Sequence, residues 1–251
     1  MVFADHAIAL VLVVLAPLWG RRSWRRLQRA LANGREEARL SAYAGTILLE
    51  WSLAIVVLVA WIALRRPLAS AGLSASLAWP FVITLALAAA LGALLLAQVR
   101  AVRGLDAAGR ASLQRQLAPV QTLLPHTAGE RDVFLALSLT AGFCEELLYR
   151  GFLIGYLAPF TGIAGAVMAS AVVFGLVHGY QGRGGILKTG AIGLVMGLIY
   201  AVSGSVWPAV VLHAAFDVQG GLIGYEVFSR AGRQVGGDRP ARPGAVGLSG
   251  A

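Results

Sequence analysis

The stretch Ala141-Gly-Phe-Cys-Glu-Glu-Leu-Leu-Tyr-Arg-Gly-Phe-Leu153 places three charged residues inside an apolar run that extends from Val133 to Leu157. That run is long enough to cross a bilayer as a helix. Charges at such depth are costly and normally face the interior of a helix bundle, where they have partners. Glu146 and Arg150 are four residues apart with the acid first, which favours an ion pair on a helix. Glu145 lies about 100° around the helix from Glu146, so this pattern leaves one carboxylate free.

The composition of the whole chain indicates a membrane protein rather than a soluble domain. Of its 251 residues, 58% are hydrophobic and only 13% are charged, whereas a soluble domain averages about 25% charged residues. The net charge of +9 does not indicate a nucleic-acid partner, because the arginines cluster between apolar segments, where they set membrane topology. The single cysteine, Cys144, lies within the apolar run, so no internal disulfide can form.

The apolar segments predict an all-α fold, a polytopic membrane bundle of about seven (seven to eight) transmembrane helices. The expected spans cover about residues 7–19, 42–64, 80–99, 133–157, 163–178, 186–202 and 206–228. The first is short, and an interfacial helix is the alternative at that position. The N-terminus lacks a basic region, and an Arg-Arg pair follows its apolar run. We therefore expect a retained span rather than a cleaved signal peptide.

Three regions follow from these spans. Residues 1–130 hold the first three spans with basic cytoplasmic loops, and residues 131–228 form the membrane core that carries the polar residues. Within this core we expect a glycine-rich loop over residues 179–185. Residues 229–251 are rich in glycine, arginine and proline, which predicts a disordered cytoplasmic tail.

The distribution of basic residues predicts the orientation of the chain. If the spans alternate sides, one side holds the segments 20–39, 100–131 and 179–188 together with the tail. That side then carries 18 of the 21 lysine and arginine residues. Loops rich in lysine and arginine stay in the cytoplasm. We therefore expect a protein of the plasma membrane with its N-terminus outside and its C-terminus in the cytoplasm.

Three late spans carry polar side chains at membrane depth. The fourth has Glu145 beside the ion pair, the fifth ends in His178, and the seventh carries His213 and Asp217 on one helix face. Carboxylates and histidines that converge in hydrocarbon form a candidate active site. A carboxylate beside a histidine can take a proton from water, and a second histidine oriented by a carboxylate can donate to an oxyanion. This set suffices for amide hydrolysis without a covalent intermediate.

Three motifs, in this order along the chain, resemble those of the CPBP intramembrane protease family. The motifs are Glu145-Glu146-x-x-x-Arg150, Phe174-x-x-x-His178 and His213-x-x-x-Asp217. The family includes the type II CAAX prenyl endopeptidases, also called Abi proteins, and the resemblance covers roughly residues 130–228. It implies an intramembrane endopeptidase that acts on a membrane-associated protein or peptide, prenylated or not.

The resemblance also implies a role for each motif residue. Glu145 and His178 would activate the hydrolytic water, and His213 and Asp217 would support the oxyanion. The acid and arginine of the first motif would form the structural pair, in agreement with their spacing. Asp217 stands where the prenyl endopeptidases usually have asparagine, which leaves the CAAX substrate class open. Tyr149 stands where phenylalanine is common.

Members of this family are often called metalloproteases. Glu145, His178 and His213 could supply three ligands to a divalent metal such as zinc and leave a fourth position for water. The chain has no HExxH motif, the strongest sequence indication of a zinc site. From the residue types alone, a bound metal is therefore less expected than a site without one.

Two other functions use the same residues. In a proton-coupled transporter the carboxylates and histidines would relay protons, although the chain has no evident repeated halves of the kind that many transporters carry. In a non-catalytic membrane scaffold or immunity protein they would be structural. Outside the motifs, Glu50 is interpreted as structural or of unknown role, and His126 as a solvated loop residue. Tyr180 and Gln181 either cap the glycine-rich loop or touch substrate.

Overall fold

The computed structural model describes residues 2–237, and the surroundings of side chains for residues 2–229. No strand occurs within this part of the chain. Its helices are α1 (Phe3–Leu10), η1 (Val11–Leu15), α2 (Ala16–Ala32), α3 (Ala38–Ala63), η2 (Leu68–Ala71), α4 (Trp79–Arg103), α5 (Ala107–Leu117), η3 (Ala118–Val120), α6 (Ala128–Glu146), η4 (Leu147–Ile154), α7 (Gly155–Val177), η5 (His178–Gln181), α8 (Gly182–Ser203) and α9 (Trp207–Gly237).

Four helical stretches of the described residues are long and apolar enough to cross a membrane. They are Phe3–Ala32, Ala38–Ala63, Trp79–Arg103 and Ala128–Ser203. The last has 76 residues, whereas about 20 suffice for one span. It is interrupted where Gly162 and Gly182 adopt positive φ values of 69° and 82°, a conformation that glycine reaches without a steric penalty. The all-α membrane class is therefore confirmed, and the count of seven or eight spans stays a prediction.

The structure corrects three local expectations. The basic segment after the first span was expected to be a loop, but the helix continues through η1 and α2 to Ala32. The glycine-rich loop over 179–185 is instead one short helix, η5, followed directly by α8. The tail was expected to begin at residue 229, but α9 extends to Gly237. The rest of that expected tail, residues 238–251, lies outside the described residues.

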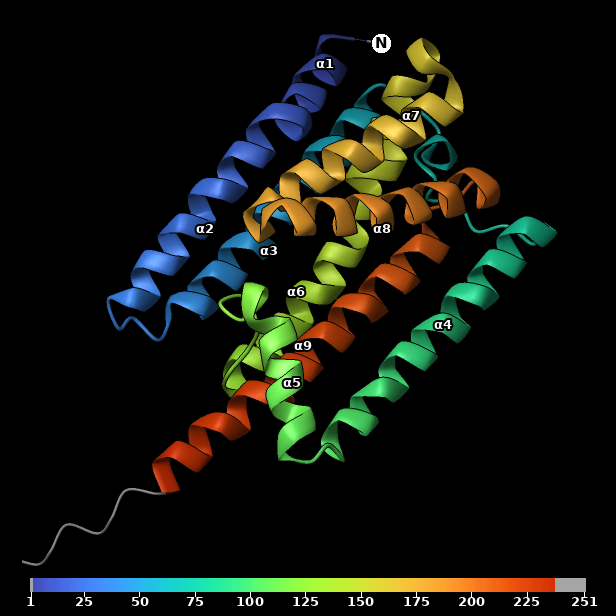
Figure 1. Cartoon of the computed structure of the whole chain (residues 1–251). Coiled ribbons are helices and arrows are strands. Elements are labelled where there is room, and N and C mark those ends of the chain that lie inside the picture. Colours follow the sequence, from blue (N-terminus) through green and yellow to red (C-terminus); the bar gives the residue numbers. More distant parts are fainter. Residues whose placement is uncertain (1, 238–251) are drawn as a thin grey trace, which may run out of the picture.

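Helix α6 occupies the middle of the bundle (Figure 1). It packs against α3 and α9, while α9 also packs along α4 and α7 packs along α8. Helix α2 contacts α3, α7 and η5, so it closes the side of the bundle next to the end of α7. The eight residues of η4 are all buried, and five of them, Leu147, Leu148, Tyr149, Phe152 and Leu153, belong to the main hydrophobic cluster. The segment directly after the two glutamates is therefore part of the core.

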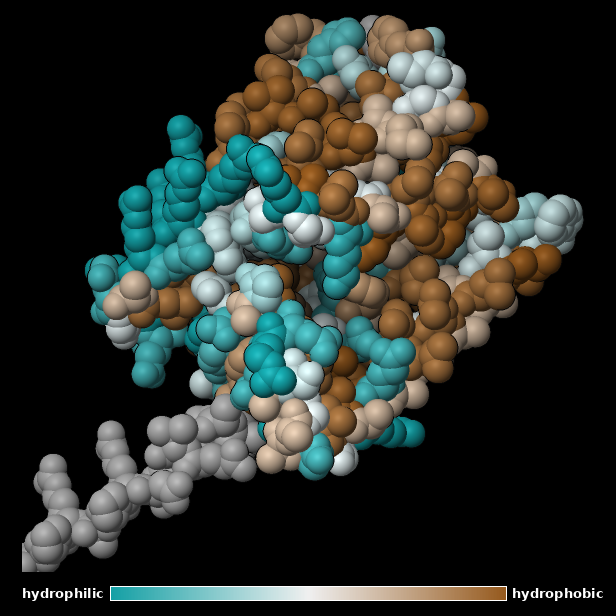
Figure 2. Space-filling model, in the orientation of Figure 1, coloured by the Kyte–Doolittle hydropathy of each residue, from teal (hydrophilic) through white to brown (hydrophobic). Residues whose placement is uncertain are grey.

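The surface has two distinct parts. Figure 2 shows hydrophilic side chains gathered at the end that carries α5 and the turn between α2 and α3, and apolar side chains over most of the remaining face. Large apolar side chains are exposed along several helices. Examples are Leu48, Val59 and Ile62 on α3, Leu87 and Leu94 on α4, and Leu198 and Val202 on α8. Such faces suit contact with lipid chains.

Candidate active site

A cavity of about 1110 Å³ penetrates the bundle between α2, α3, α6, α7, α8 and α9. Its wall includes all four residues that the sequence assigned to catalysis. Glu145 comes from α6, His178 from η5, and His213 and Asp217 from α9. Three segments that are far apart in the sequence therefore bring their polar side chains to one space, as the motifs predicted.

Helix α6 presents one face to this cavity. Ser138, Ala141, Glu145 and Leu148 all line it, and their spacings of three and four residues place them on one side of a helix. Glu146 falls on another side and is fully buried in the protein, with a side-chain exposure of 0%. The two adjacent glutamates thus have different surroundings, one at the cavity wall and one within the core.

The N-terminal end of α6 is fixed by a capping box. The Thr127 hydroxyl accepts a hydrogen bond from the Glu130 amide at 3.2 Å, and the Glu130 carboxylate accepts one from the Thr127 amide at 3.1 Å. Such reciprocal bonds satisfy amide groups that have no partner within the helix. Arg39 of α3 lies 3.4 Å from the other oxygen of Glu130. This contact holds the start of α6 against α3.

The Glu146 carboxylate is the centre of the buried network. Its Oε1 atom accepts hydrogen bonds from Arg150 Nη1 at 2.9 Å and from His213 Nδ1 at 2.7 Å. The ion pair with Arg150 was predicted from the spacing of the two residues, and it is present. The contact with His213 was not predicted, because it depends on how α9 is placed against α6. Glu146 therefore orients the ring of a candidate catalytic histidine.

Arg150 joins three helices through one side chain. Besides Glu146, its guanidinium donates from Nη2 to the Gly193 carbonyl oxygen of α8 at 3.0 Å. The same group lies 4.5 Å from the ring centroid of Phe174 on α7, within the range of a cation–π contact. Arg150 is 1% exposed. It therefore connects η4 to the two helices that flank His178.

The η4 segment, Leu147–Ile154, is a π-helix, a form that is rare and frequently found at functional sites. The wider turn changes which carbonyl groups find partners within the helix. The Tyr149 carbonyl oxygen accepts a hydrogen bond from the Ser170 hydroxyl of α7 at 2.8 Å. This contact holds α7 against the π-helix near the residues that carry the site.

His178 presents one ring nitrogen to the cavity. Its Nδ1 atom lies 2.9 Å from the Phe174 carbonyl oxygen. A carbonyl oxygen only accepts, so Nδ1 carries the proton and the neutral ring leaves Nε2 as an acceptor. The ring also contacts Phe174, with 4.7 Å between centroids. The main chain of α7 thus fixes both the position and the tautomer of this histidine.

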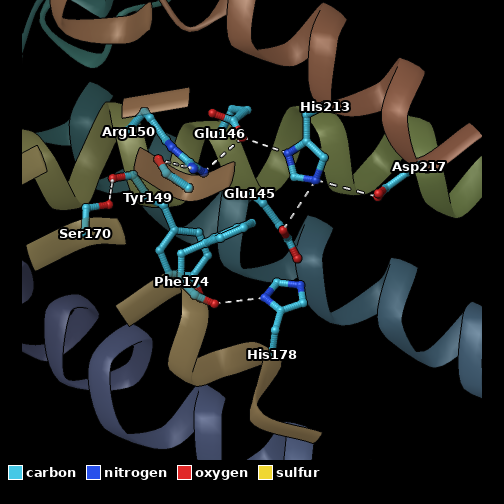
Figure 3. Close-up of polar contacts among 10 residues, drawn as sticks. Glu145, Glu146, Tyr149, Arg150, Ser170, Phe174, His178, His213 and Asp217 are labelled. Carbon is cyan, nitrogen blue, oxygen red and sulfur yellow. Dashed lines mark hydrogen bonds and ion pairs between the residues drawn. The ribbon is translucent and has the colours of Figure 1, made fainter. Parts of the chain in front are cut away.

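The Glu145 carboxylate points between the rings of His213 and His178 (Figure 3). Its Oε2 atom lies 3.8 Å from His213 Nε2, and Asp217 Oδ2 lies 3.6 Å from the same nitrogen. Both distances exceed the usual length of a direct hydrogen bond. Glu145 therefore makes no direct hydrogen bond to either residue, and its carboxylate faces the cavity.

The residue types alone did not decide whether the site binds a metal ion. Glu145, His178 and His213 all face the cavity. However, among the described residues no three His, Cys, Asp or Glu side chains are grouped closely enough to bind a metal ion together. The described side chains in this arrangement do not form a zinc site, and a metal at the cavity stays a prediction.

For residues outside the motifs, the structure agrees with some of the sequence-based expectations and differs from others. Tyr180 and Gln181 line the cavity, which agrees with a position near substrate. Glu50, interpreted as structural or of unknown role, lines the same cavity. His126, expected to be solvated, stacks on Phe228 with 5.0 Å between centroids. Burial, with a smaller effect from the charge of Arg39, lowers the pKa of His126 below its usual value.

The approach of α6 to α9 depends on the small side chain at Gly142. A Cβ atom at this position would lie 2.8 Å from Ala214 Cβ and 3.0 Å from the Ala214 backbone nitrogen. Gly142 lies one turn before Glu146, and Ala214 follows His213. Gly142→Ala should therefore separate Glu146 from His213. We expect it to lower the free energy of unfolding by about 1–3 kcal/mol, measured by denaturant titration in micelles.

The matched control for this prediction is Gly129→Ala on the same helix, where an added Cβ would meet nothing within 4 Å. Alanine is favoured over glycine in a helix, so this variant should be at least as stable as the wild type. Equal stability of the two alanine variants would show that the contact between α6 and α9 can relax at no cost.

Comparison with protein families gives a match to the second half of the chain. Residues 131–219 match the family described as Rce1-like, type II CAAX prenyl endopeptidase. The match contains all of the motif residues of the cavity wall and of the buried network. Neither the search of curated proteins nor the search of solved structures found a match.

Proposed function

We propose, from the match of residues 131–219 to the Rce1-like family, that this chain is an intramembrane endopeptidase. Its reaction is the hydrolysis of a peptide bond in a membrane-associated protein or peptide, by a water activated by Glu145 and His178. The observation that carries the proposal is the presence of both residues, with His213, on the wall of one cavity.

The water would be oriented by two acceptors. The Glu145 carboxylate accepts one of its hydrogen atoms, and Nε2 of neutral His178 accepts the other, because Nδ1 already donates to the Phe174 carbonyl. A lone pair of the water oxygen is then free to attack the substrate carbonyl carbon. As the carbon–oxygen bond forms, Glu145 takes the proton from the water, which is general-base catalysis.

His213 would stabilise the oxyanion that results. Its Nδ1 atom donates to Glu146, so Nε2 can also donate into the cavity beside Glu145 and Asp217 only when the ring carries a second proton, as the imidazolium. A preorganised donor at the position where negative charge develops lowers the barrier. When the tetrahedral intermediate collapses, the carbon–nitrogen bond breaks and the leaving amine takes the proton from Glu145. The products are a carboxylic acid, which then loses its proton to solvent, and an amine.

The volume and the lining of the cavity suit a peptide substrate that carries an apolar group. Its volume of about 1110 Å³ is slightly above the usual range of about 300–1,000 Å³ for ligand sites. Much of its wall is apolar, with side chains such as Leu49, Leu53 and Ile192 beside the polar groups. Such a wall accommodates an extended peptide together with an apolar chain, and a prenylated C-terminus has both.

The test is the cleavage of quenched fluorescent peptides by the purified full chain in detergent. A farnesylated CAAX peptide and its unprenylated counterpart would be compared, each with wild type and Glu145→Ala and each with and without a chelator. We expect the farnesylated peptide to be cleaved by the wild type with or without chelator, and not by Glu145→Ala.

Each other result has a distinct meaning. Cleavage that Glu145→Ala retains would contradict the assigned base. Loss of wild-type cleavage in chelator would contradict the metal-independent reaction. Equal cleavage of both peptides would keep the endopeptidase and exclude prenyl recognition. No cleavage of either peptide by the wild type would contradict an endopeptidase of the CAAX type.

A further inference from the structure

The cavity contains a third glutamate that the motifs do not include. Glu50 lies in the middle of α3, outside the matched segment 131–219. It lines the cavity together with Glu145 and His213. Its exposed fraction is 8%, and its Oε2 atom is buried without a hydrogen-bond partner. A polar side chain in this state needs an explanation, because buried polar groups are nearly always hydrogen-bonded.

Glu50 differs from the other buried acids of the described residues. Those four each have an arginine partner. The pairs are Asp5 with Arg66 at 2.7 Å, Glu130 with Arg39 at 3.4 Å, Glu146 with Arg150 at 2.9 Å and Glu226 with Arg103 at 2.9 Å. Within the same part of the chain, Glu50 has neither an ion pair nor a hydrogen bond. The fold therefore provides a partner for every buried acid except the one that faces the cavity from α3.

An unpartnered buried carboxyl does not stabilise the fold. Burial without a compensating contact costs free energy, and the cost is far larger for the charged form than for the neutral one. An apolar residue at this position would avoid that cost. A neutral carboxyl group presents one donor and one acceptor side by side, which complements the N–H and C=O groups of a peptide backbone.

We propose that Glu50 is a substrate-positioning residue whose neutral carboxyl hydrogen-bonds a backbone peptide group of a peptide bound in the cavity. This inference rests on the proposed endopeptidase function and deepens it, because it names the chemical group that the site recognises. Recognition of backbone rather than of a side chain suits an enzyme whose substrates share an extended segment. It also assigns a part of the site to α3, which packs against α6.

The test is peptide binding to the full chain in detergent, with Glu145→Ala present in every variant so that no peptide is cleaved. Fluorescence polarisation of a labelled farnesylated CAAX peptide gives the Kd. We expect Glu50→Leu to raise the Kd about tenfold to hundredfold, because a buried hydrogen bond to the peptide is lost. Glu50→Gln keeps one donor and one acceptor, so its Kd should stay within about threefold.

Ser52→Ala is the matched control on the same helix, α3. Ser52 is exposed and does not line the cavity, and its hydroxyl donates to the Leu48 carbonyl oxygen at 2.6 Å. Its Kd should therefore not change. A thermal unfolding measurement separates a structural role from a binding role. A structural role requires Glu50→Leu to lower the Tm, whereas the proposed role requires an equal or higher Tm together with weaker binding.

Four outcomes would overturn the proposal. They are unchanged binding by Glu50→Leu, a lower Tm for that variant, equal losses in Glu50→Leu and Glu50→Gln, and no binding of the peptide when Glu50 is intact. The cleavage assay decides the proposed function separately. Binding that depends on Glu50, in a protein whose wild type cleaves nothing, would sustain this inference and refute the endopeptidase.

Discussion

Glu145→Gln is expected to lower kcat for peptide cleavage by about 10²- to 10⁴-fold, the range that a general base contributes. Glutamine has nearly the same shape but accepts no proton from water. The nearest polar contact of the carboxylate, His213 Nε2, is 3.8 Å away, so the substitution breaks no direct hydrogen bond. The free energy of unfolding should therefore change little, and the loss should appear in kcat rather than in peptide binding.

The control is Asp132→Asn, the same acid-to-amide change on the same helix. Asp132 is 63% exposed and pairs with the neighbouring Arg131, so it lies outside the cavity. This variant should cleave at the wild-type rate. Initial rates across a range of peptide concentrations give kcat and KM for both variants. A Glu145→Gln enzyme with wild-type kcat would refute the assignment of this carboxylate as the base.

Local spacing along single helices was the most informative feature of the sequence. The four-residue spacing of Glu146 and Arg150 predicted an ion pair, and the 100° offset of Glu145 predicted a carboxylate outside it. Both are geometric properties of one helix, and the structure has both. The three motifs also predicted which spans converge. These inferences succeeded because helix geometry fixes the relative direction of neighbouring side chains.

Contacts between helices could not be predicted in the same way. The bond from His213 to Glu146 depends on the register of α9 against α6, which is set by the close approach at Gly142. The position of Glu50 on the cavity wall depends on how α3 packs against α6. No pattern along one chain segment encodes the rotation of a helix relative to its neighbour. One signal was available, because an acid in the middle of an apolar span is itself a candidate for function.

The predicted helix boundaries were wrong for a different reason. The first span was expected to end before the basic segment, because arginines are unfavourable in hydrocarbon. The helix continues through that segment to Ala32, since arginine is a good helix former whether or not lipid surrounds it. The hydropathy of a segment thus predicts where lipid contact ends, and helix propensity decides where the helix ends.

Arg150→Met is expected to lower the free energy of unfolding by about 3–5 kcal/mol, the largest effect on stability that we predict. Methionine has a similar length but leaves the Glu146 carboxylate without its cation in a place where the exposed fraction is 0%. The Gly193 carbonyl and the ring of Phe174 lose their contact as well. Denaturant titration in mixed micelles gives the free energy, and cleavage should fall because His213 loses the orientation that Glu146 provides.

A double variant distinguishes the effect of the unpaired Glu146 charge from the loss of the Arg150 contacts with Gly193 and Phe174. In Arg150→Met combined with Glu146→Gln, no uncompensated charge remains, and the amide oxygen of glutamine can still accept from His213 Nδ1. Replacement of both members of a buried ion pair by neutral groups is often nearly neutral for stability. We therefore expect the double variant to recover most of the loss. Arg131→Met, at the partly exposed pair with Asp132 and beside the Tyr225 ring, should lower the free energy of unfolding by no more than about 1 kcal/mol. A double variant no more stable than Arg150→Met would mean that Arg150 acts mainly through the contacts that join η4 to α7 and α8.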